Sequence, residues 1–242
     1  MIMKKMMKIT AVIAAFFSMV TLTSCLDGEN GTNYDLYDYV TVVSGGYGDT
    51  YLKGDMTDLT LYPVSSSVLE PLRLNSGEYY KRAYVGVKLA EAYSTSKDKY
   101  NISEIAVLQA IPYKSFNERV DTLVGNSKLN SFGSSIWAKS GFVNVDFSVN
   151  VKASETANFY NDIHMYITKA SQDTLYTKLR YVKDNVGGQN YSVFVSFQLP
   201  KYSSEYANIH PKNDSIVVKV EAESELKGKL SAYTKCRYSE IY

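Results

Sequence analysis

Apolar and polar residues alternate along most of the chain after residue 36, and this alternation is the period of a β-strand with one buried face. The clearest example is FVNVDFSVNV (142–151), where Val or Phe occupies every second position from 143 to 151. We expect this apolar set to be buried. We expect the polar set between them to meet water, namely Asn144, Asp146, Ser148 and Asn150.

The same alternation recurs several times after residue 112 and predicts a β-sandwich. The segments concerned are residues 163–168, 174–182, 190–198 and 215–223, with residues 120–125 as a further strand. Residues 171–173 and the Gly-Gly pair at 187–188 separate strands as turn formers. Residues 155–162 and 203–210 are either short helices or loops. Six or so antiparallel strands joined in this way are typical of a β-sandwich.

The stretch from residue 36 to 112 predicts a separate, smaller barrel. Strands are expected at residues 37–43, 50–55, 58–64 and 78–93, with the glycine-rich residues 44–49 as a hairpin turn. Residues 102–111 form either a strand or a short helix that ends at Pro112. A helical turn is compatible with the Pro- and Ser-containing residues 63–77. Such short strands, with one long strand that contains glycine, are typical of an OB-like barrel. The predicted fold class is therefore all-β: an OB-like five-stranded barrel over 36–112, followed by an antiparallel β-sandwich over 113–242.

The first 24 residues read as a lipoprotein signal peptide. Three lysines among the first eight residues precede the apolar segment 9–22, and no acidic residue occurs before Asp27. The apolar segment is shorter than the ~20 residues that a transmembrane helix needs. It ends in LTSC (22–25), which resembles the bacterial lipobox and implies cleavage before Cys25 and attachment of lipid to its thiol and new amine. The alternative is a simple signal peptide with a chance cysteine. Residues 25–35 would then form a flexible tether.

Charge argues against two classes of partner. Removal of residues 1–24 takes away three lysines and leaves 23 basic and 25 acidic side chains. A nearly neutral chain with both signs interspersed is not expected to bind nucleic acid or to be drawn strongly to anionic lipid. Tyrosine is abundant, with 22 residues, whereas Trp137 is the only tryptophan.

Several stretches of the sequence resemble the NigD-like lipoproteins of Gram-negative anaerobes. Besides the lipobox they are VTVVSGGYGDTYLKGDMTDLTLYPV (40–64), YVGVKLAE (84–91), LNSFGSSIWAKSGFVNVDFSVNV (129–151) and DTLYTKLRYV (173–182). The resemblance implies an N-terminal OB-like domain and a C-terminal β-sandwich. It also suggests an immunity role, since the family takes its name from a gene placed beside a bacteriocin. It carries over no functional residues.

The residues offer little catalytic chemistry, so we predict neither an enzyme nor a cofactor nor a metal site. His164 falls on the polar face of its strand and His210 in a loop, and we expect both to be exposed. Neither has the neighbours of a metal site. With Cys25 lipidated, Cys236 lacks a disulfide partner and is expected to be a buried structural thiol rather than a reactive one. Glu221 and Glu223 share the outer face of a strand, where carboxylates either meet water or bind Ca²⁺.

Aromatic residues are the candidate recognition groups. Tyr79, Tyr80 and Tyr84 lie on or near the long strand of the predicted barrel, and OB-like barrels bind ligands on a strand face and its flanking loops. These rings, and Trp137, either pack in the core and at the domain junction or contact a sugar or protein.

Three segments fit an Asp-Ser/Thr-aliphatic pattern that resembles an O-glycosylation site of exported bacterial proteins. They place candidate acceptors at Thr122, Thr174 and Ser215. Chance matches are the alternative in a sequence rich in Asp and Ser.

The sequence thus predicts a non-catalytic lipoprotein of the bacterial cell envelope. We expect it to act as a protein-interaction module of bacteriocin-immunity type. The expected partners are the outer membrane, through the lipid on Cys25, and a second protein. A carbohydrate-binding accessory lipoprotein is the main alternative, with a glycan as partner. A hydrolase that uses His164 or His210 is a third hypothesis.

Overall fold

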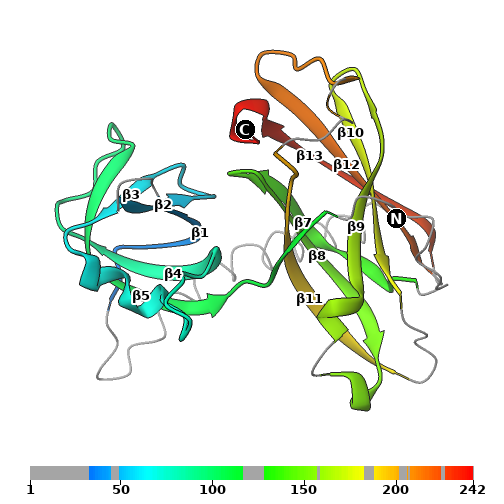
Figure 1. The fold of residues 1–242 in the computed structure, drawn as a ribbon, viewed down its shortest axis with the longest axis horizontal. Coiled ribbons are helices and arrows are strands. Elements are labelled where there is room, and N and C mark those ends of the chain that lie inside the picture. The colour runs from blue at the N-terminus through cyan, green and yellow to red at the C-terminus, as the bar shows by residue number, and fades with distance from the viewer. Residues whose placement is uncertain are drawn as a thin grey trace, which may run out of the picture. The chain divides into compact units, whose positions relative to one another are not determined.

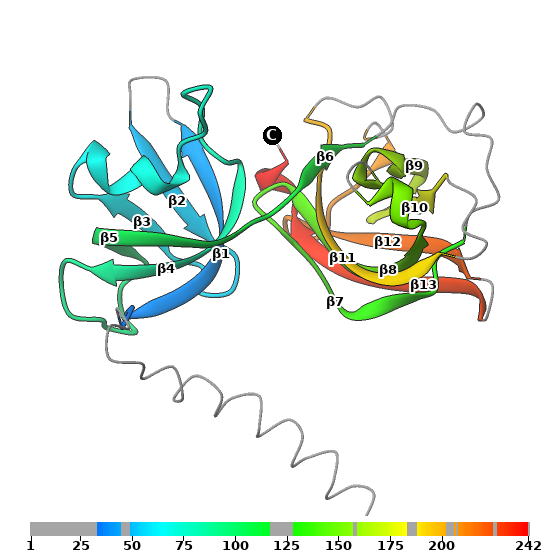
Figure 2. The ribbon, with the colours of Figure 1, turned by 90° about the horizontal axis from the view of Figure 1, so that it is seen from below.

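The computed structural model describes residues 33–44, 49–116, 128–156, 159–182, 188–201, 206, 208–224 and 227–241. The chain divides into two units, Met1–Asp35 and Leu36–Tyr242. The second unit holds both the barrel strands β1–β5 and the later strands β6–β13, which Figure 1 and Figure 2 show as two groups joined by the chain between β5 and β6. Cys25, Thr122 and the predicted strand 120–125 lie outside the described residues.

The first group is a closed five-stranded barrel, as predicted. Its strands are β1 (Leu36–Ser44), β2 (Thr50–Gly54), β3 (Thr60–Pro63), β4 (Arg82–Leu89) and β5 (Lys99–Ala110). They follow each other around the barrel in the order β1-β2-β3-β5-β4, with β4 closing onto β1. All pairs are antiparallel except β3 with β5, which lie parallel. The topology confirms the OB-like prediction, and residues 102–111 belong to a strand rather than a helix.

The barrel interior is filled by side chains from alternate strand positions. Val40, Leu52, Leu61 and Val85 are fully buried there. The predicted helical turn between residues 63 and 77 is the 3-10 helix η2 (Ser66–Leu72), whose Leu69 and Leu72 are buried. The helix therefore covers the barrel core with its apolar side.

The second group is a sandwich of two four-stranded sheets. One sheet has the order β6-β11-β8-β7. It contains β6 (Tyr113–Ser115), β7 (Ser131–Lys139), β8 (Phe142–Val151) and β11 (Gln189–Gln198). Its pairs are antiparallel except β6 with β11.

The other sheet has the order β13-β12-β10-β9. It contains β9 (Ile163–Ser171), β10 (Thr174–Tyr181), β12 (Ser215–Ser224) and β13 (Gly228–Arg237). Only β10 and β12 lie parallel. The buried faces of both sheets share one apolar core that includes Val145, Phe147 and Val218. The β-sandwich prediction is confirmed, with two parallel pairings among the antiparallel ones.

Short 3-10 helices occupy some of the segments between strands. Residues 155–162, predicted as helix or loop, overlap the helices η3 (Ala153–Glu155) and η4 (Phe159–Asp162). A third, η6 (Tyr238–Glu240), follows the last strand. Within the part of the chain that the structure describes, none of the helices has the length and apolar character of a membrane span.

The polar face of β8 departs from the prediction. The expected wet set includes Asn144, which is fully buried, and Ser148, which is 8% exposed, whereas Asp146 and Asn150 are partly exposed. Asn144 is covered because Arg82 of the barrel strand β4 donates to its side-chain oxygen. The alternation found the right face of the strand, but contact with the barrel removes part of that face from water.

Candidate functional site

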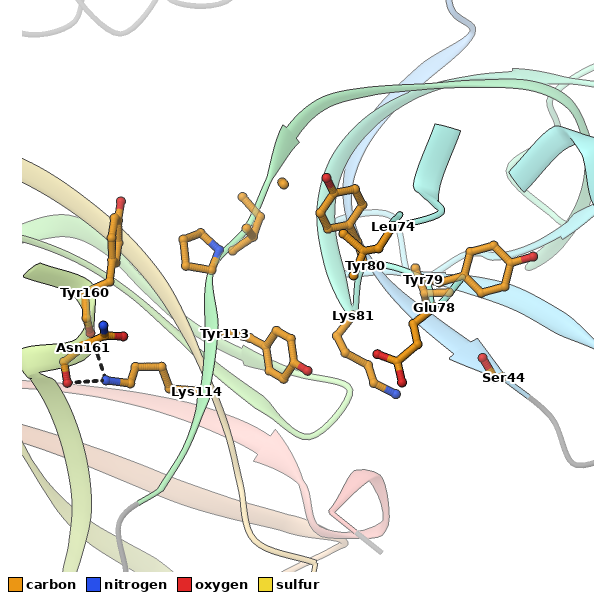
Figure 3. Close-up of a pocket in the computed structure, with 14 residues that line it drawn as sticks. Ser44, Leu74, Glu78, Tyr79, Tyr80, Lys81, Tyr113, Lys114, Tyr160 and Asn161 are labelled. Carbon is orange, nitrogen blue, oxygen red and sulfur yellow. Dashed lines mark hydrogen bonds between the residues drawn. The ribbon is translucent and has the colours of Figure 1, made fainter. Parts of the chain in front are cut away.

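A groove lies where the chain passes from barrel to sandwich (Figure 3), and its volume is about 810 Å³. This size falls within the ~300–1,000 Å³ range of small-molecule sites. The barrel contributes apolar, tyrosine and charged side chains, and the sandwich contributes the tip of β6 and the helix η4. The lining residues are Val42, Ser44, Leu74, Glu78, Tyr79, Tyr80, Lys81, Ala110, Ile111, Pro112, Tyr113, Lys114, Tyr160 and Asn161.

The chain between β5 and β6 forms one side of the groove and is bonded to both domains. The Ile111 amide donates to the carbonyl oxygen of Arg82 on β4 at 3.1 Å. The Ser196 amide of β11 donates to the carbonyl oxygen of Pro112 at 3.0 Å. Because Pro112 has no amide hydrogen, it can take part in such a ladder only as an acceptor. This connection is therefore a fixed part of the structure rather than a free linker.

Four tyrosines stand around the groove. Figure 3 shows Tyr160 near one end, Tyr79 near the other, and Tyr80 and Tyr113 between them. Tyr113 is 45% exposed, and the Tyr79 hydroxyl accepts a hydrogen bond from Arg73. Two of the three barrel tyrosines singled out from the sequence thus line a recess. The third, Tyr84, packs against Tyr39 instead, with ring centres 4.8 Å apart.

Charges in the groove nearly cancel. The Lys114 ammonium donates to the carbonyl oxygens of Tyr160 and Asn161, at 2.9 and 3.1 Å, and also to that of Ile163. Three acceptors match the three donors of an ammonium group, so Lys114 is occupied by backbone. Burial lowers its pKa. The other charged lining residues are Glu78 and Lys81, which are exposed and opposite in sign.

His164 differs from the prediction, because it is half-buried rather than exposed. Burial lowers the pKa of its imidazole, and the nearby Lys114 charge lowers it further. Its Nδ1 has no hydrogen-bond partner among the described residues. His164 does not line the groove, and its surroundings disfavour the charged imidazole.

Behind the groove, Arg82 joins barrel and sandwich through a buried polar network, which we call the junction lock. Both Arg82 and the Asp55 side chain are fully buried, and they form a two-pronged ion pair with N–O distances of 2.5 and 2.8 Å. Arg82 also donates to Thr41 of the barrel and to Asn144 and Ser196 of the sandwich. All five guanidinium N–H groups thus have acceptors.

Aromatic rings flank the junction lock. The Trp137 indole N–H donates to Asp55 Oδ2 at 2.8 Å, across the junction. Its ring stacks on Phe194 with centres 5.2 Å apart and lies 5.2 Å from Tyr39 of the barrel. Trp137 therefore takes the interdomain packing role, one of the two alternatives left by the sequence.

A second buried carboxylate, that of Asp38, stabilises the β2–β3 turn that carries Asp55. Asp38 accepts hydrogen bonds from the amides of Met56 and Thr57, each at 3.0 Å, and from the Thr57 hydroxyl at 2.6 Å. Further along the turn, Asp58 forms an ion pair with Lys139 of the sandwich. Sequence reasoning missed these groups, because a single Arg or Asp in a strand gives no sign of its distant partner.

The remaining candidate residues lie apart from the groove. His210 is exposed, as expected, and Cys236 is 6% exposed, which agrees with a structural thiol. Glu221 pairs with Lys219 and Lys229, and Glu223 with Lys178, so these carboxylates form surface ion pairs. No group of three His, Cys, Asp or Glu side chains among the described residues could hold a metal ion.

Comparison with known proteins gives one family match and several similar structures. Residues 112–233 match the family model described as NigD-like C-terminal beta sandwich domain. A solved protein of Parabacteroides distasonis, described as toxin-related, aligns at 20% identity over 85% of this chain and 94% of its own, with a TM-score of 0.56.

Two further structures come from Bacteroides. One, from Bacteroides fragilis and described as a lipoprotein, aligns at 14% identity over 84% of this chain and 97% of its own, with a TM-score of 0.51. Another, from Bacteroides caccae and described as a NigD-like immunity protein, aligns at 15% identity over 84% and 94%, with a TM-score of 0.41. No protein with a curated description matches the chain.

Proposed function

The chain belongs to the family with the NigD-like C-terminal β-sandwich domain, and from this we propose that it is a non-catalytic lipoprotein of the cell envelope that recognises a second protein, in the manner of a bacteriocin-immunity protein. The observation that carries the proposal is the tyrosine-lined groove beside the junction lock. Tyrosine is enriched at protein interfaces because it offers a large, stiff apolar ring with a polar end.

The groove chemistry favours a partner segment with little net charge. Lys114 is occupied by three carbonyl oxygens, and Glu78 and Lys81 balance each other. A strongly charged partner would lose hydration on entering without gaining an opposite charge. The partner would thus present apolar and uncharged polar side chains to the four tyrosines.

The partner proposal can be tested by capture from envelope extract. Tyr113→Ala and Tyr80→Ala should each lower recovery of a specific partner at least several-fold, since truncated aromatic anchors typically cost about 1–4 kcal/mol of binding. Tyr233→Ala is the matched control, because Tyr233 is 74% exposed on β13, away from the groove. Equal recovery with the groove variants and the control would reject the groove as the interface.

The lipid anchor is a separate part of the proposal and rests on the lipobox ending at Cys25. The description of the Bacteroides fragilis structure as a lipoprotein accords with it. Three acyl chains would hold the protein firmly to a bilayer, most simply the outer membrane. Cells grown with labelled palmitate should label the natural chain and leave Cys25→Ser unlabelled. Persistent labelling of the variant would refute attachment at Cys25.

A carbohydrate-binding role is the second candidate, favoured by the same uncharged, tyrosine-rich lining. Sugar rings stack on aromatic faces, and their hydroxyls suit tyrosine and asparagine groups. A glycan array separates the candidates: binding that is lost in Tyr113→Ala but kept in Tyr113→Phe would indicate stacking on the ring. A blank array together with a captured protein would favour the protein partner.

The candidate glycosylation sites remain a proposal of their own. Thr174 and Ser215 are half-buried at the starts of β10 and β12, and the Thr174 hydroxyl donates to Asp173. Intact-mass measurement of the natural protein should show added hexose at Thr122, Thr174 or Ser215. A mass that matches the lipidated polypeptide alone would reject all three.

A further inference from the structure

We propose that the junction lock makes barrel and sandwich one rigid body, and that Arg82 is the positioning residue that fixes the shape of the groove without lining it. The lock is defined by Arg82, Asp55, Asn144 and Ser196. Thr41 supports it from the barrel and Trp137 from the sandwich.

The first argument is how fully the network is satisfied. Arg82 gives two N–H groups to Asp55, one to Thr41, and the remaining two to Asn144 and Ser196. Ser196 in turn donates to Asn144 Oδ1 at 2.6 Å. Arg82 and Asp55 come from the barrel, whereas Asn144 and Ser196, two of the acceptors of Arg82, come from the sandwich. Separation of the domains would therefore leave the charged pair with only its barrel partners.

The second argument is where the apolar cores end. The barrel core and the sandwich core are two separate clusters of buried residues. The described side-chain contacts across the junction are instead the polar lock, the Asp58–Lys139 ion pair and a few rings, such as Phe142 under the Arg82 guanidinium at 5.2 Å. A directional polar network allows one docking geometry, whereas an apolar contact tolerates sliding. The lock thus determines how the domains dock.

The third argument connects the lock to the groove. The backbone of Arg82 accepts from Ile111, and the backbone of Ser196 donates to Pro112. Both Ile111 and Pro112 line the groove. The same two residues therefore hold the lock through their side chains and the groove through their backbones. A loss of the lock should alter the groove even though Arg82 itself does not line it.

The test variant replaces the Arg82 guanidinium with an uncharged, unbranched side chain. Arg82→Met would leave the Asp55 carboxylate buried without its cation, and the domains should separate to hydrate it. Trp137, the only tryptophan, reports docking directly because its indole lies at the junction. We expect the fluorescence emission of Trp137 to shift to longer wavelength and the radius of gyration from X-ray scattering to increase. We also expect one unfolding transition in the natural chain and two in the variant.

Two further variants distinguish the loss of the Arg82–Asp55 ion pair from a general loss of stability. Arg237→Met, at an exposed arginine on β13, should change none of the three readouts. Arg82→Met with Asp55→Asn removes the unpaired charge but keeps an oxygen for Trp137, so it should return emission and scattering toward the natural values. Unchanged readouts in Arg82→Met, or no recovery in the double variant, would overturn the proposal.

A measurement on the unmodified chain covers the case in which Arg82→Met fails to fold. Amide relaxation by NMR reports the rotational correlation time of each domain in the natural folded part. One common value for barrel and sandwich is expected of a rigid body. Distinct, faster values for the two domains would overturn the proposal.

Discussion

At the scale of single residues, burial sets the chemistry of the one described cysteine. Burial raises the pKa of the Cys236 thiol to about 12, with smaller contributions from Glu240 and Asp214. At pH 8 this leaves roughly one thiol in 10⁴ ionised, and the thiolate is the reactive form. In a chain with Cys25→Ser, we predict that Cys236 resists a thiol reagent until denaturant is added. Rapid labelling of the folded protein would contradict this.

The folded structure disfavours the ionised form of the Asp146 side chain. Burial raises its pKa, and its neighbours include the ring of Tyr39. Since the folded state binds the proton more readily than the unfolded chain, the natural protein loses stability as pH rises past the ordinary aspartate value. We predict that Asp146→Asn is more stable than the natural protein at pH 7. The difference should vanish by about pH 3, where both states are protonated.

Denaturant unfolding at several pH values tests the Asp146 prediction. Asp98→Asn, at an exposed aspartate of the barrel, is the matched control and should show no such gain. A variant less stable than the natural protein at pH 7 would indicate that the Asp146 carboxylate makes a favourable interaction.

The alternation in the sequence assigns residues to one face or the other of a strand, but it does not show which distant residues they contact. Alternation placed Asn144 on the polar side of its strand, yet Asn144 is fully buried against Arg82, 62 positions earlier in the chain. No local pattern marks such a long-range pair, because a buried arginine and an exposed one look alike in a strand. The same holds for Lys114, whose three carbonyl acceptors follow it by more than 40 residues.

At the scale of elements, the β2–β3 turn depends on one buried side chain. Asp38 accepts three hydrogen bonds from Met56 and Thr57, and so places Asp55 toward Arg82. Asp38→Ala would leave two partly buried amides and a hydroxyl without their carboxylate acceptor, at a cost of about 1–3 kcal/mol of unfolding free energy. Thermal or denaturant unfolding measures the loss, and Asp98→Ala should leave stability nearly unchanged. Equal stability of the two variants would show that water replaces the carboxylate.

The β7–β8 hairpin has a turn that requires glycine for two reasons. Ser140 and Gly141 both have positive φ, at 52° and 77°, as a two-residue type I′ turn demands. A Cβ on Gly141 would also lie 2.9 Å from the carbonyl oxygen of Glu240. We predict that Gly141→Ala lowers unfolding free energy by about 1–3 kcal/mol.

Gly228 separates the two causes of that loss. Its φ is +70°, but a Cβ there would meet nothing within 4 Å. Gly228→Ala therefore measures the conformational penalty alone, and Gly141→Ala should lose more stability in the same denaturant series. If the two losses are equal, the contact with Glu240 adds nothing.

The elements that alternation predicted are those with one strongly apolar face. β8 and β12 appear nearly at the predicted residues. β6, β7 and β13 were not predicted. β6 has three residues, β7 contains a register shift between Phe132 and Ile136, and β13 buries little besides Cys236. Short, bulged or edge strands lack the repeated apolar positions by which alternation indicates a strand.

At the scale of the whole molecule, the two domains differ in how much core they hold. The described buried hydrophobic cluster has thirteen residues in the barrel and twenty-six in the sandwich. The family match covers the sandwich, whereas the barrel was predicted from its strand pattern and from the resemblance to NigD-like lipoproteins. The tyrosines that line the groove come from both domains, because Tyr79 and Tyr80 belong to the barrel, and Tyr113 and Tyr160 to the sandwich side. The groove therefore needs both domains.

This difference predicts how the separated domains behave. If the domains are residues 36–112 and 113–242, as proposed from the sequence, the isolated sandwich keeps its larger core and should unfold cooperatively. The isolated barrel is close to the size of ~70–80 residues below which a single core supplies only a few kcal/mol of stability. It should therefore unfold at a much lower denaturant concentration. It would also expose the Arg82–Asp55 pair to water, which weakens an ion pair. Circular dichroism of the two fragments in urea measures this. A barrel fragment as stable as the sandwich fragment would contradict this prediction.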